Sequence, residues 1–385
     1  MTSEAAHQHL RILMISSLDT TEFYGQSTRP YYIGRSLAEM GANVLHLCPR
    51  PPSNRFLNTS FVALGKRKGR LAALVSVVTI LHRLWSFGPD VVYAHQMHPM
   101  RLATYPARLM RKPLVFDIHG SATQELRAIA SVDYERARFI RRIEQMAVNA
   151  ADKVIVVSTE LREFLRATFA VPEDRLVVVP NGIDLRSFRR NGFTHHVQKD
   201  RAALHIPKHN SVVAFTCPRG FPSNEIALEW FFQVVPMVES KRSDVTFLVL
   251  GGGKIIPAPS RSVVYTGFVR DLRRILAISD VCVLPYPPTA VCGGARNKAL
   301  EYLAAGKPVV STLEGMRGIK AVPGRDYLLA ESREEFAQGI MDLLSDKSLA
   351  KRIASSGSLV AEQYDWRVLA RRVYLVLSSL STHSA

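Results

Sequence analysis

Short runs of β-branched and other apolar residues recur along the first half of this chain, and helix-like segments follow them. The runs are RILMISS (11–17), DVVYAH (90–95), PLVFD (113–117), VIVVS (154–158) and LVVVP (176–180). Strands that are apolar along their whole length are typical of parallel sheets that helices cover on both faces. This half of the chain is therefore predicted to form an α/β domain built from βα units.

The same alternation restarts after a polar, turn-rich stretch between Asn181 and Asn210. The second set of runs covers 212–217, 246–251, 263–267, 281–286 and 308–312. Because domains cluster at ~100–200 residues, a chain of 385 residues has room for two. We therefore expect two Rossmann-like, doubly wound α/β domains, at 1–185 and 211–365. Residues 186–210 are expected to link them, and a helix at 366–385 is expected to cross back to the first domain.

The formal net charge of +17 suits a protein that approaches an anionic partner. Nucleic acid, a phospholipid surface and a phosphorylated substrate all fit that charge. A basic nucleic-acid-binding protein is the less favoured reading, because the sequence has no helix-turn-helix, zinc-finger spacing or RNA-recognition signature. The four cysteines are far apart and lack metal-ligand spacing, so we expect reduced, structural thiols. No secretory signal and no apolar stretch of ~20 residues is found, so we expect a cytoplasmic protein.

The most informative loop follows the run at 281–286 and reads PPTAVCGGARNKALEYLAAGKPVVST (287–312). Gly293 and Gly294 permit close backbone approach, and the helix that they open presents free N–H groups to an anion such as a diphosphate. Lys298 and Glu301 are three residues apart, so they share a face of that helix. They would offer a cation for phosphate and a carboxylate for sugar hydroxyls. A plain turn followed by a solvated Lys298–Glu301 ion pair would give the same spacing.

These residues, GGARNK followed by ALEYLAAGKPVVST, resemble the donor-site signature of family-four retaining glycosyltransferases of the GT-B fold, also described as glycosyl transferases group 1. Further matches follow one another in the expected order, from about Leu10 to the final helix. They are the loop at Gly25 leading into RSLAEMGANV (35–44), FDIHG (116–120), ADKVIVVS (151–158), VVPNGID (178–184) and TGFVRDLRRILAISDVCVLPY (266–286).

The resemblance implies two Rossmann-like domains that face each other across a cleft. The second domain would bind a nucleotide-diphosphate sugar, and the first would hold a glycan or lipid-linked acceptor. Transfer would retain the anomeric configuration without a bound metal or other cofactor, and the sequence agrees in having no Asp-x-Asp metal motif. By the same resemblance, Glu301 binds the nucleotide ribose and Lys298 is the basic residue before it. His119 would lie near the transferred sugar, and Gly25 would let the first domain reach the phosphates. His119 as a buried structural histidine and Gly25 as a turn glycine remain alternatives.

Two positions depart from the family pattern. Many members carry a glutamate that contacts the donor sugar eight residues before Glu301, where this chain has Gly293. The Arg and Lys that usually follow the first strand of the second domain are also absent, although Arg219 lies nearby in a shifted register. Phosphate neutralisation is therefore expected to depend on Lys298 and Arg296. The missing glutamate leaves open a nucleotide-sugar-binding protein that is epimerase-like or does not transfer sugar.

The positive charge is concentrated between residues 50 and 112, which hold eleven Lys or Arg and a single acid, Asp90. Lys66, Arg67, Lys68 and Arg70 directly precede an apolar, helix-like segment at 71–84. We expect these four residues to lead contact with the anionic inner face of a membrane, because each Lys or Arg near such a surface contributes ~1 kcal/mol. The alternative is that 71–84 is a crossover helix packed on the sheet and that the basic residues form its solvated approach.

Overall fold

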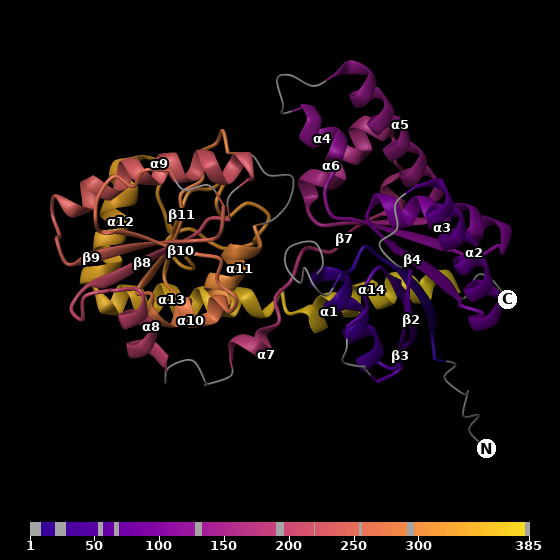
Figure 1. The fold of residues 1–385 in the computed structure, drawn as a ribbon, viewed down its shortest axis with the longest axis horizontal. Helices are drawn as coiled ribbons and strands as arrows, with labels where there is room; N and C mark the ends of the chain where they lie inside the picture. The colour runs from indigo at the N-terminus through magenta and orange to yellow at the C-terminus, as the bar shows by residue number, and fades with distance from the viewer. Residues whose placement is uncertain are drawn as a thin grey trace. The chain divides into compact units, whose positions relative to one another are not determined.

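The computed structural model describes residues 9–19, 28–52, 57–64, 69–127, 133–189, 196–218, 220–253, 256–290 and 296–381. The chain divides into two compact units (Figure 1). Unit 1 comprises Met1–Asn181 with Trp366–Ala385, and unit 2 comprises Gly182–Asp365. Each unit is a parallel sheet flanked by helices, which confirms the predicted α/β class with two doubly wound domains.

The sheet of unit 1 has seven parallel strands in the order β3-β2-β1-β4-β5-β6-β7. The order reverses between β1 and β4, the position at which ligands bind in open α/β sheets. Most of these strands are buried along their whole length, which explains their continuous apolar sequences. The strands are β1 (Arg11–Ile15), β2 (Asn43–Cys48), β3 (Thr59–Ala63), β4 (Val91–His95), β5 (Leu114–Ile118), β6 (Lys153–Val156) and β7 (Leu176–Val178).

Two helical layers cover the two faces of this sheet. Helices α2, α3, α5 and α6 bury residues in one core cluster, whereas α1 and α14 bury residues in the other. Side-chain caps fix several helix starts; for example, the Ser158 hydroxyl accepts from Leu161 N at the start of α6. The helices are α1 (Thr28–Glu39), α2 (Arg70–Phe87), α3 (Met97–Leu109), α4 (Ala122–Arg127), α5 (Tyr134–Ala150), α6 (Thr159–Phe169) and α14 (Trp366–Ser381), with a 3-10 turn at Glu173–Arg175.

Unit 2 repeats the plan with six parallel strands in the order β10-β9-β8-β11-β12-β13, which reverses between β8 and β11. The strands are β8 (Ser211–Thr216), β9 (Val245–Leu250), β10 (Val263–Gly267), β11 (Val281–Leu284), β12 (Val309–Ser311) and β13 (Leu328–Leu329). The helices are α7 (Leu185–Phe188), α8 (Val197–Ala203), α9 (Pro222–Glu239), α10 (Leu272–Ile278), α11 (Asn297–Ala304), α12 (Arg333–Ser345) and α13 (Lys347–Glu362).

The described part of the expected linker, 186–210, belongs to unit 2 and includes the short helices α7 and α8. Asp200 of α8 pairs with Arg274, whose Nε lies 3.0 Å from Asp200 Oδ2. The polar, aperiodic sequence does not indicate this ion pair, because Asp200 and Arg274 are 74 residues apart in the chain. At the other end, α14 packs against α1 in unit 1, where the Trp366 and Tyr32 rings stack at 6.0 Å.

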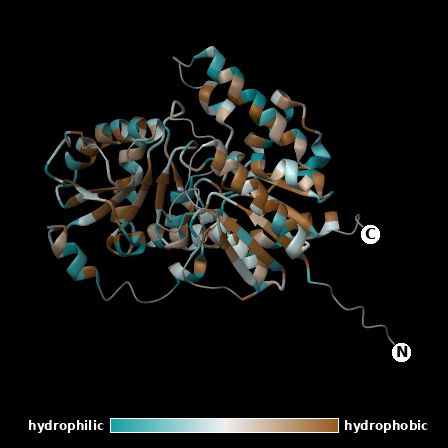
Figure 2. Ribbon diagram, turned by 45° about the vertical axis from the view of Figure 1, so that its right-hand side comes forward, coloured by the Kyte–Doolittle hydropathy of each residue, from teal (hydrophilic) through white to brown (hydrophobic). Residues whose placement is uncertain are grey.

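The strands form the apolar interior of each unit, as colouring by hydropathy makes visible (Figure 2). Cys48, Cys217 and Cys282 are buried free thiols, and burial raises the pKa of Cys48 and of Cys282 to about 12. Cys292 lies outside the described residues. Within the described ranges, no helix combines the length and apolarity needed to cross a bilayer.

Candidate functional site

Three polar side chains meet at the carboxyl edge of the unit 2 sheet, near the reversal between β8 and β11. Asn224 lies in the first turn of α9, Tyr286 lies two residues beyond β11, and Lys298 lies in the first turn of α11. Lys298 Nζ donates to Asn224 Oδ1 at 3.0 Å and also to the Tyr286 hydroxyl. That hydroxyl donates in turn to Asn224 Oδ1 at 2.8 Å. We call these three residues the Lys298 cluster.

Aromatic rings form the floor beneath Lys298. The Tyr286 ring is fully buried and packs edge-on against Phe215, with centroids 5.9 Å apart. Lys298 Nζ lies 5.0 Å from the Tyr286 centroid and 5.8 Å from that of Phe215, within the range of cation–π attraction. The ammonium is therefore held in one place before any ligand arrives.

Asn224 is fixed by the loop that follows β8. Its Nδ2 donates to the Pro218 carbonyl at 2.6 Å. Gly251, directly after the neighbouring β9, allows this loop to pass close by, because a Cβ there would lie 2.6 Å from Pro218 Cα. Gly251 also has φ +134°, which side-chain-bearing residues rarely adopt. The close packing of two strand ends thus orients the amide oxygen toward Lys298.

Glu301 lies on α11, three residues beyond Lys298. Burial raises the pKa of its carboxyl group to about 7, although Lys298 acts to lower it. Among the described residues, the carboxyl group has no hydrogen-bond partner, so it can accept hydrogen bonds from a ligand. A solvated ion pair would leave Lys298 and Glu301 exposed, whereas both are half-buried.

Arg296, expected to neutralise phosphate, is itself neutralised in the structure. Its side chain is buried, and Nη2 lies 3.0 Å from Glu314 Oε1 while Nε donates to the Glu314 carbonyl. The guanidinium carbon lies 3.5 Å from the Tyr286 ring centroid. Arg296 therefore supports the Lys298 cluster through Tyr286, and direct contact with a phosphate stays a prediction.

Several residues of the predicted site lie outside the described residues: Gly25, Lys66, Arg67, Lys68, Arg219, Gly293 and Gly294. Arg70 begins α2, but its side chain is not among those described. The structure thus brings together Lys298, Glu301 and Arg296 in unit 2 and places His119 in unit 1.

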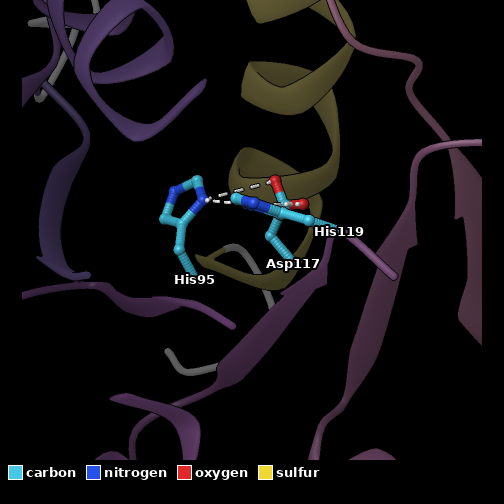
Figure 3. A group of neighbouring side chains, drawn as sticks. All are labelled: His95, Asp117 and His119. Atoms are coloured by element: carbon cyan, nitrogen blue, oxygen red, sulfur yellow. Dashed lines mark hydrogen bonds and ion pairs between the residues drawn. The ribbon is translucent and has the colours of Figure 1, made fainter. Parts of the chain in front are cut away.

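His119 belongs to a buried polar network at the carboxyl edge of unit 1 (Figure 3). Asp117 of β5 is its centre, and Arg29 Nε of α1 donates to both carboxylate oxygens at 3.0 and 3.1 Å. The Tyr93 hydroxyl also donates to Asp117 Oδ2. His119 Nε2 lies 3.5 Å from Asp117 Oδ1 and 3.3 Å from Nδ1 of His95, the last residue of β4.

The network holds one charged pair and two neutral imidazoles. Burial lowers the pKa of His119 to about 4 and that of His95 well below its usual value. Burial by itself would raise the pKa of Asp117, but Arg29 and the neighbouring donors hold it below its usual value. At neutral pH His119 can therefore exchange hydrogen bonds with an uncharged group such as a sugar hydroxyl, but it does not offer a positive charge. It is also the most exposed of the three residues drawn in Figure 3.

Ligand atoms of His95, Asp117 and His119 lie within 4.8 Å of one another, a spacing compatible with a metal ion. The carboxylate, however, already accepts from Arg29 and Tyr93, and the guanidinium would repel a second cation. This donor set fits a hydrogen-bonded network better than a divalent metal site.

A pocket of about 220 Å³ opens beside this edge of unit 1. Ser16 and Ser17 beyond β1 line it together with His98 at the start of α3. Residues of α2, including Ala73 and Ser76, form another wall. Hydroxyl and imidazole groups beside small apolar side chains suit a ligand with both polar and apolar parts.

Five residues of these two clusters were not predicted from the sequence: Asn224 and Tyr286 in unit 2, and Arg29, Tyr93 and His95 in unit 1. Some of them could have been inferred, because burying a polar side chain in an apolar strand costs free energy unless the side chain finds a hydrogen-bond partner. The sequence places Tyr93 and His95 in one such strand and Asp117 in the next. No comparable signal marked Arg29 or Asn224.

Comparison with known proteins gives concordant matches over both units. Residues 23–187 match the model described as Glycosyltransferase Family 4, and residues 212–346 match the model described as Glycosyl transferases group 1. A D-inositol 3-phosphate glycosyltransferase of Corynebacterium diphtheriae is 24% identical over 91% of this chain and 83% of its own length. Among solved structures, a glycosyltransferase from Rickettsia africae has a TM-score of 0.75 at 15% identity and covers 98% of this chain and 100% of its own. The Anabaena protein HepE in complex with UDP-glucose has a TM-score of 0.70 at 17% identity over 96% of this chain and 100% of its own.

Proposed function

Because the chain belongs to the glycosyltransferases of family 4 and group 1, we propose that it takes its sugar from a nucleotide-diphosphate sugar. Transfer retains the anomeric configuration, requires no bound metal, and delivers the sugar to a glycan or lipid-linked acceptor. The observation that carries this proposal is the Lys298 cluster, with Glu301 one turn away, at the strand reversal of unit 2.

Lys298 acts on the leaving group. When the bond between the sugar and the diphosphate breaks, its electron pair moves to a phosphate oxygen, where negative charge grows. An ammonium already fixed by Asn224 and Tyr286 stabilises this charge without reorganising, so it favours the transition state over the ground state. A cation placed in this way supplies the neutralisation that a metal ion would otherwise provide.

Glu301 binds the nucleotide. Its carboxyl group has no hydrogen-bond partner among the described side chains and can accept from the ribose hydroxyls. The pKa of about 7 means that a substantial fraction is protonated at neutral pH, so the bound donor selects the ionised form.

In unit 1, His119 lies near the transferred sugar, and the pocket beside α2 takes the acceptor. A neutral imidazole suits contact with sugar hydroxyls. The UDP-glucose bound to HepE makes UDP-sugars the first donors to test. The name of the corynebacterial relative makes a phosphorylated polyol a reasonable first acceptor.

The test begins with thermal-shift measurements against UDP-, GDP-, ADP- and dTDP-sugars. The donor that stabilises the protein is then used in a transfer assay, and NMR of the anomeric centre gives the stereochemistry. We expect a retained configuration and the same rate with and without a chelator. An inverted product, or activity that a chelator removes and magnesium or manganese restores, would contradict the proposal. Donor binding without product from any acceptor would instead support a protein that binds nucleotide sugars and does not transfer them.

A further inference from the structure

Helix α2 presents an apolar stripe to solvent. Leu71 and Trp85 are 75% and 76% exposed, and Leu74, Val75 and Val78 are 59%, 56% and 56% exposed. At about 100° per residue these positions follow one line along the helix. Ile80 and Leu84, on the opposite side, are buried against the sheet. Packing as a crossover helix therefore explains the inner face of α2 and leaves its outer face without an apolar partner among the described residues.

The neighbouring helix α3 adds basic residues to the same side. It packs against α2 and buries Met100 and Ala103 in the same core cluster, so both helices lie in one layer over one face of the sheet. Arg101 and Arg108 project from the side of α3 that faces away from the sheet, and neither forms an ion pair with a described residue. Tyr105 and Leu109 are exposed beside them. We call the outward faces of the two helices the α2–α3 surface.

The segment that forms the two helices carries almost no negative charge of its own. Between residues 69 and 112 the only acid is Asp90, and its carboxylate accepts from the backbone N of Arg11 at 2.7 Å. In the sequence, three further basic residues stand at 66–68, directly before α2. An exposed apolar stripe beside basic side chains is complementary to a surface that is apolar inside and negative at its boundary.

We propose that the α2–α3 surface docks on an anionic lipid bilayer, with α2 lying in the plane of the interface. The stripe enters the boundary between headgroups and acyl chains, and the arginines contact lipid phosphates. Trp85, at the end of the stripe, is the residue type that prefers this boundary. The proposal goes beyond glycosyl transfer, because it concerns where the protein is held and needs no donor or acceptor.

Vesicle flotation of the full chain tests the docking directly. We compare vesicles of pure phosphatidylcholine with vesicles containing one third phosphatidylglycerol, in the absence of any nucleotide or sugar. Binding is expected only to the anionic vesicles. Raising the salt from 0.1 to 1 M should weaken it at least tenfold, because the screening length falls from ~10 to ~3 Å.

Two double variants separate the apolar and charged contributions. Leu71→Ser with Leu74→Ser, and Arg101→Ser with Arg108→Ser, should each reduce partitioning at least tenfold. The matched control is Leu359→Ser with Leu375→Ser, which changes two leucines that are 63% and 64% exposed on other helices. The control should bind as the unaltered protein does, and circular dichroism checks that every variant is folded.

Equal binding to both kinds of vesicle, or equal loss in the control, would overturn the proposal. Light scattering measures the oligomeric state and so tests whether a second copy of the chain binds this surface instead. A dimer that dissociates in the Leu71→Ser, Leu74→Ser variant would assign the α2–α3 surface to that second copy and overturn the proposal. Since flotation uses no sugar donor, a failed transfer assay would leave this result unaffected. A failure of flotation would equally leave the proposed transfer reaction standing.

Discussion

Acidification from pH 7.5 to pH 5 should destabilise unit 1 and leave unit 2 intact. Unit 1 buries His46, His95 and His119. Burial lowers the pKa of His46 to about 3 and that of His119 to about 4, and it holds the pKa of His95 well below its usual value. The histidines described in unit 2 are all exposed, so unit 2 serves as an internal control.

The direction of this change in stability depends on whether the folded or the unfolded chain binds protons more tightly. A histidine whose pKa is lower in the folded than in the unfolded chain contributes its full stability above the unfolded pKa of ~6.5. That contribution is lost as the pH falls from ~6.5 toward the folded value, at ~1.36 kcal/mol per pH unit. At pH 5 the loss is therefore ~2 kcal/mol for each such histidine, or ~4 kcal/mol for His46 and His119 together. His95 adds a loss of the same sign. Typical domains are stable by only ~5–15 kcal/mol, so the effect should be large.

Unit 2 should respond in the opposite direction. Burial raises the pKa of Glu301 to about 7, so the folded unit binds this proton more tightly than the unfolded chain does. Its stability should rise as the pH falls from above 7 toward the unfolded value of ~4.3.

Hydrogen–deuterium exchange read by mass spectrometry can follow both units in one sample. Protection of β1 and β5 reports on unit 1 and that of β8 and β9 on unit 2, after correction for the intrinsic pH dependence of exchange. Replacing His46 by Gln should remove ~2 kcal/mol of the acid sensitivity of unit 1. The reasoning is refuted if the opening free energy of unit 1 changes by less than ~1 kcal/mol between pH 7.5 and 5, or if both units weaken equally.

Three further predictions concern unit 2. Glu301→Ala should weaken donor binding by ~1.5–3 kcal/mol, the range for hydrogen bonds to a charged group, and unchanged affinity by calorimetry would remove Glu301 from the donor site. Lys298→Ala should lower kcat more than it raises KM, since its charge acts mainly in the transition state, and a change confined to KM would speak against this role. Glu314→Ala should destabilise unit 2 by ~3–5 kcal/mol in denaturant unfolding, because it leaves Arg296 buried without its carboxylate. The exposed Glu334→Ala is the control, and equal losses in the two variants would refute the ion-pair argument.

The architecture could be predicted from the sequence because its strands are buried on both faces and therefore read as unbroken apolar runs. That Lys298 and Glu301 share one face of a helix could also be predicted, because residues three apart in a helix lie on the same side. Asn224 reaches Lys298 from 74 residues away, and Arg29 reaches Asp117 from 88, so no local pattern reveals either contact.

For Arg296, the sequence shows the charge but not its partner. The sequence places this cation beside the predicted phosphate site, whereas in the structure it forms an ion pair with Glu314, 18 residues further along the chain. The outer stripe of α2 was hidden because the helix is apolar on both its sides, and the sequence does not say which side the sheet covers. Only the burial of Ile80 and Leu84 separates the inner side from the outer one.

The position of α14 has a consequence for how the chain matures during synthesis. Trp366, Leu369, Val373 and Leu377 of this last helix are buried in the core of unit 1, beside α1. Unit 2 precedes these residues in the chain, so the part of the sheet face that α14 covers stays open until all of unit 2 has been synthesised. Unit 1 therefore cannot complete its core before unit 2 has been synthesised, although domains usually fold in order from the N-terminus.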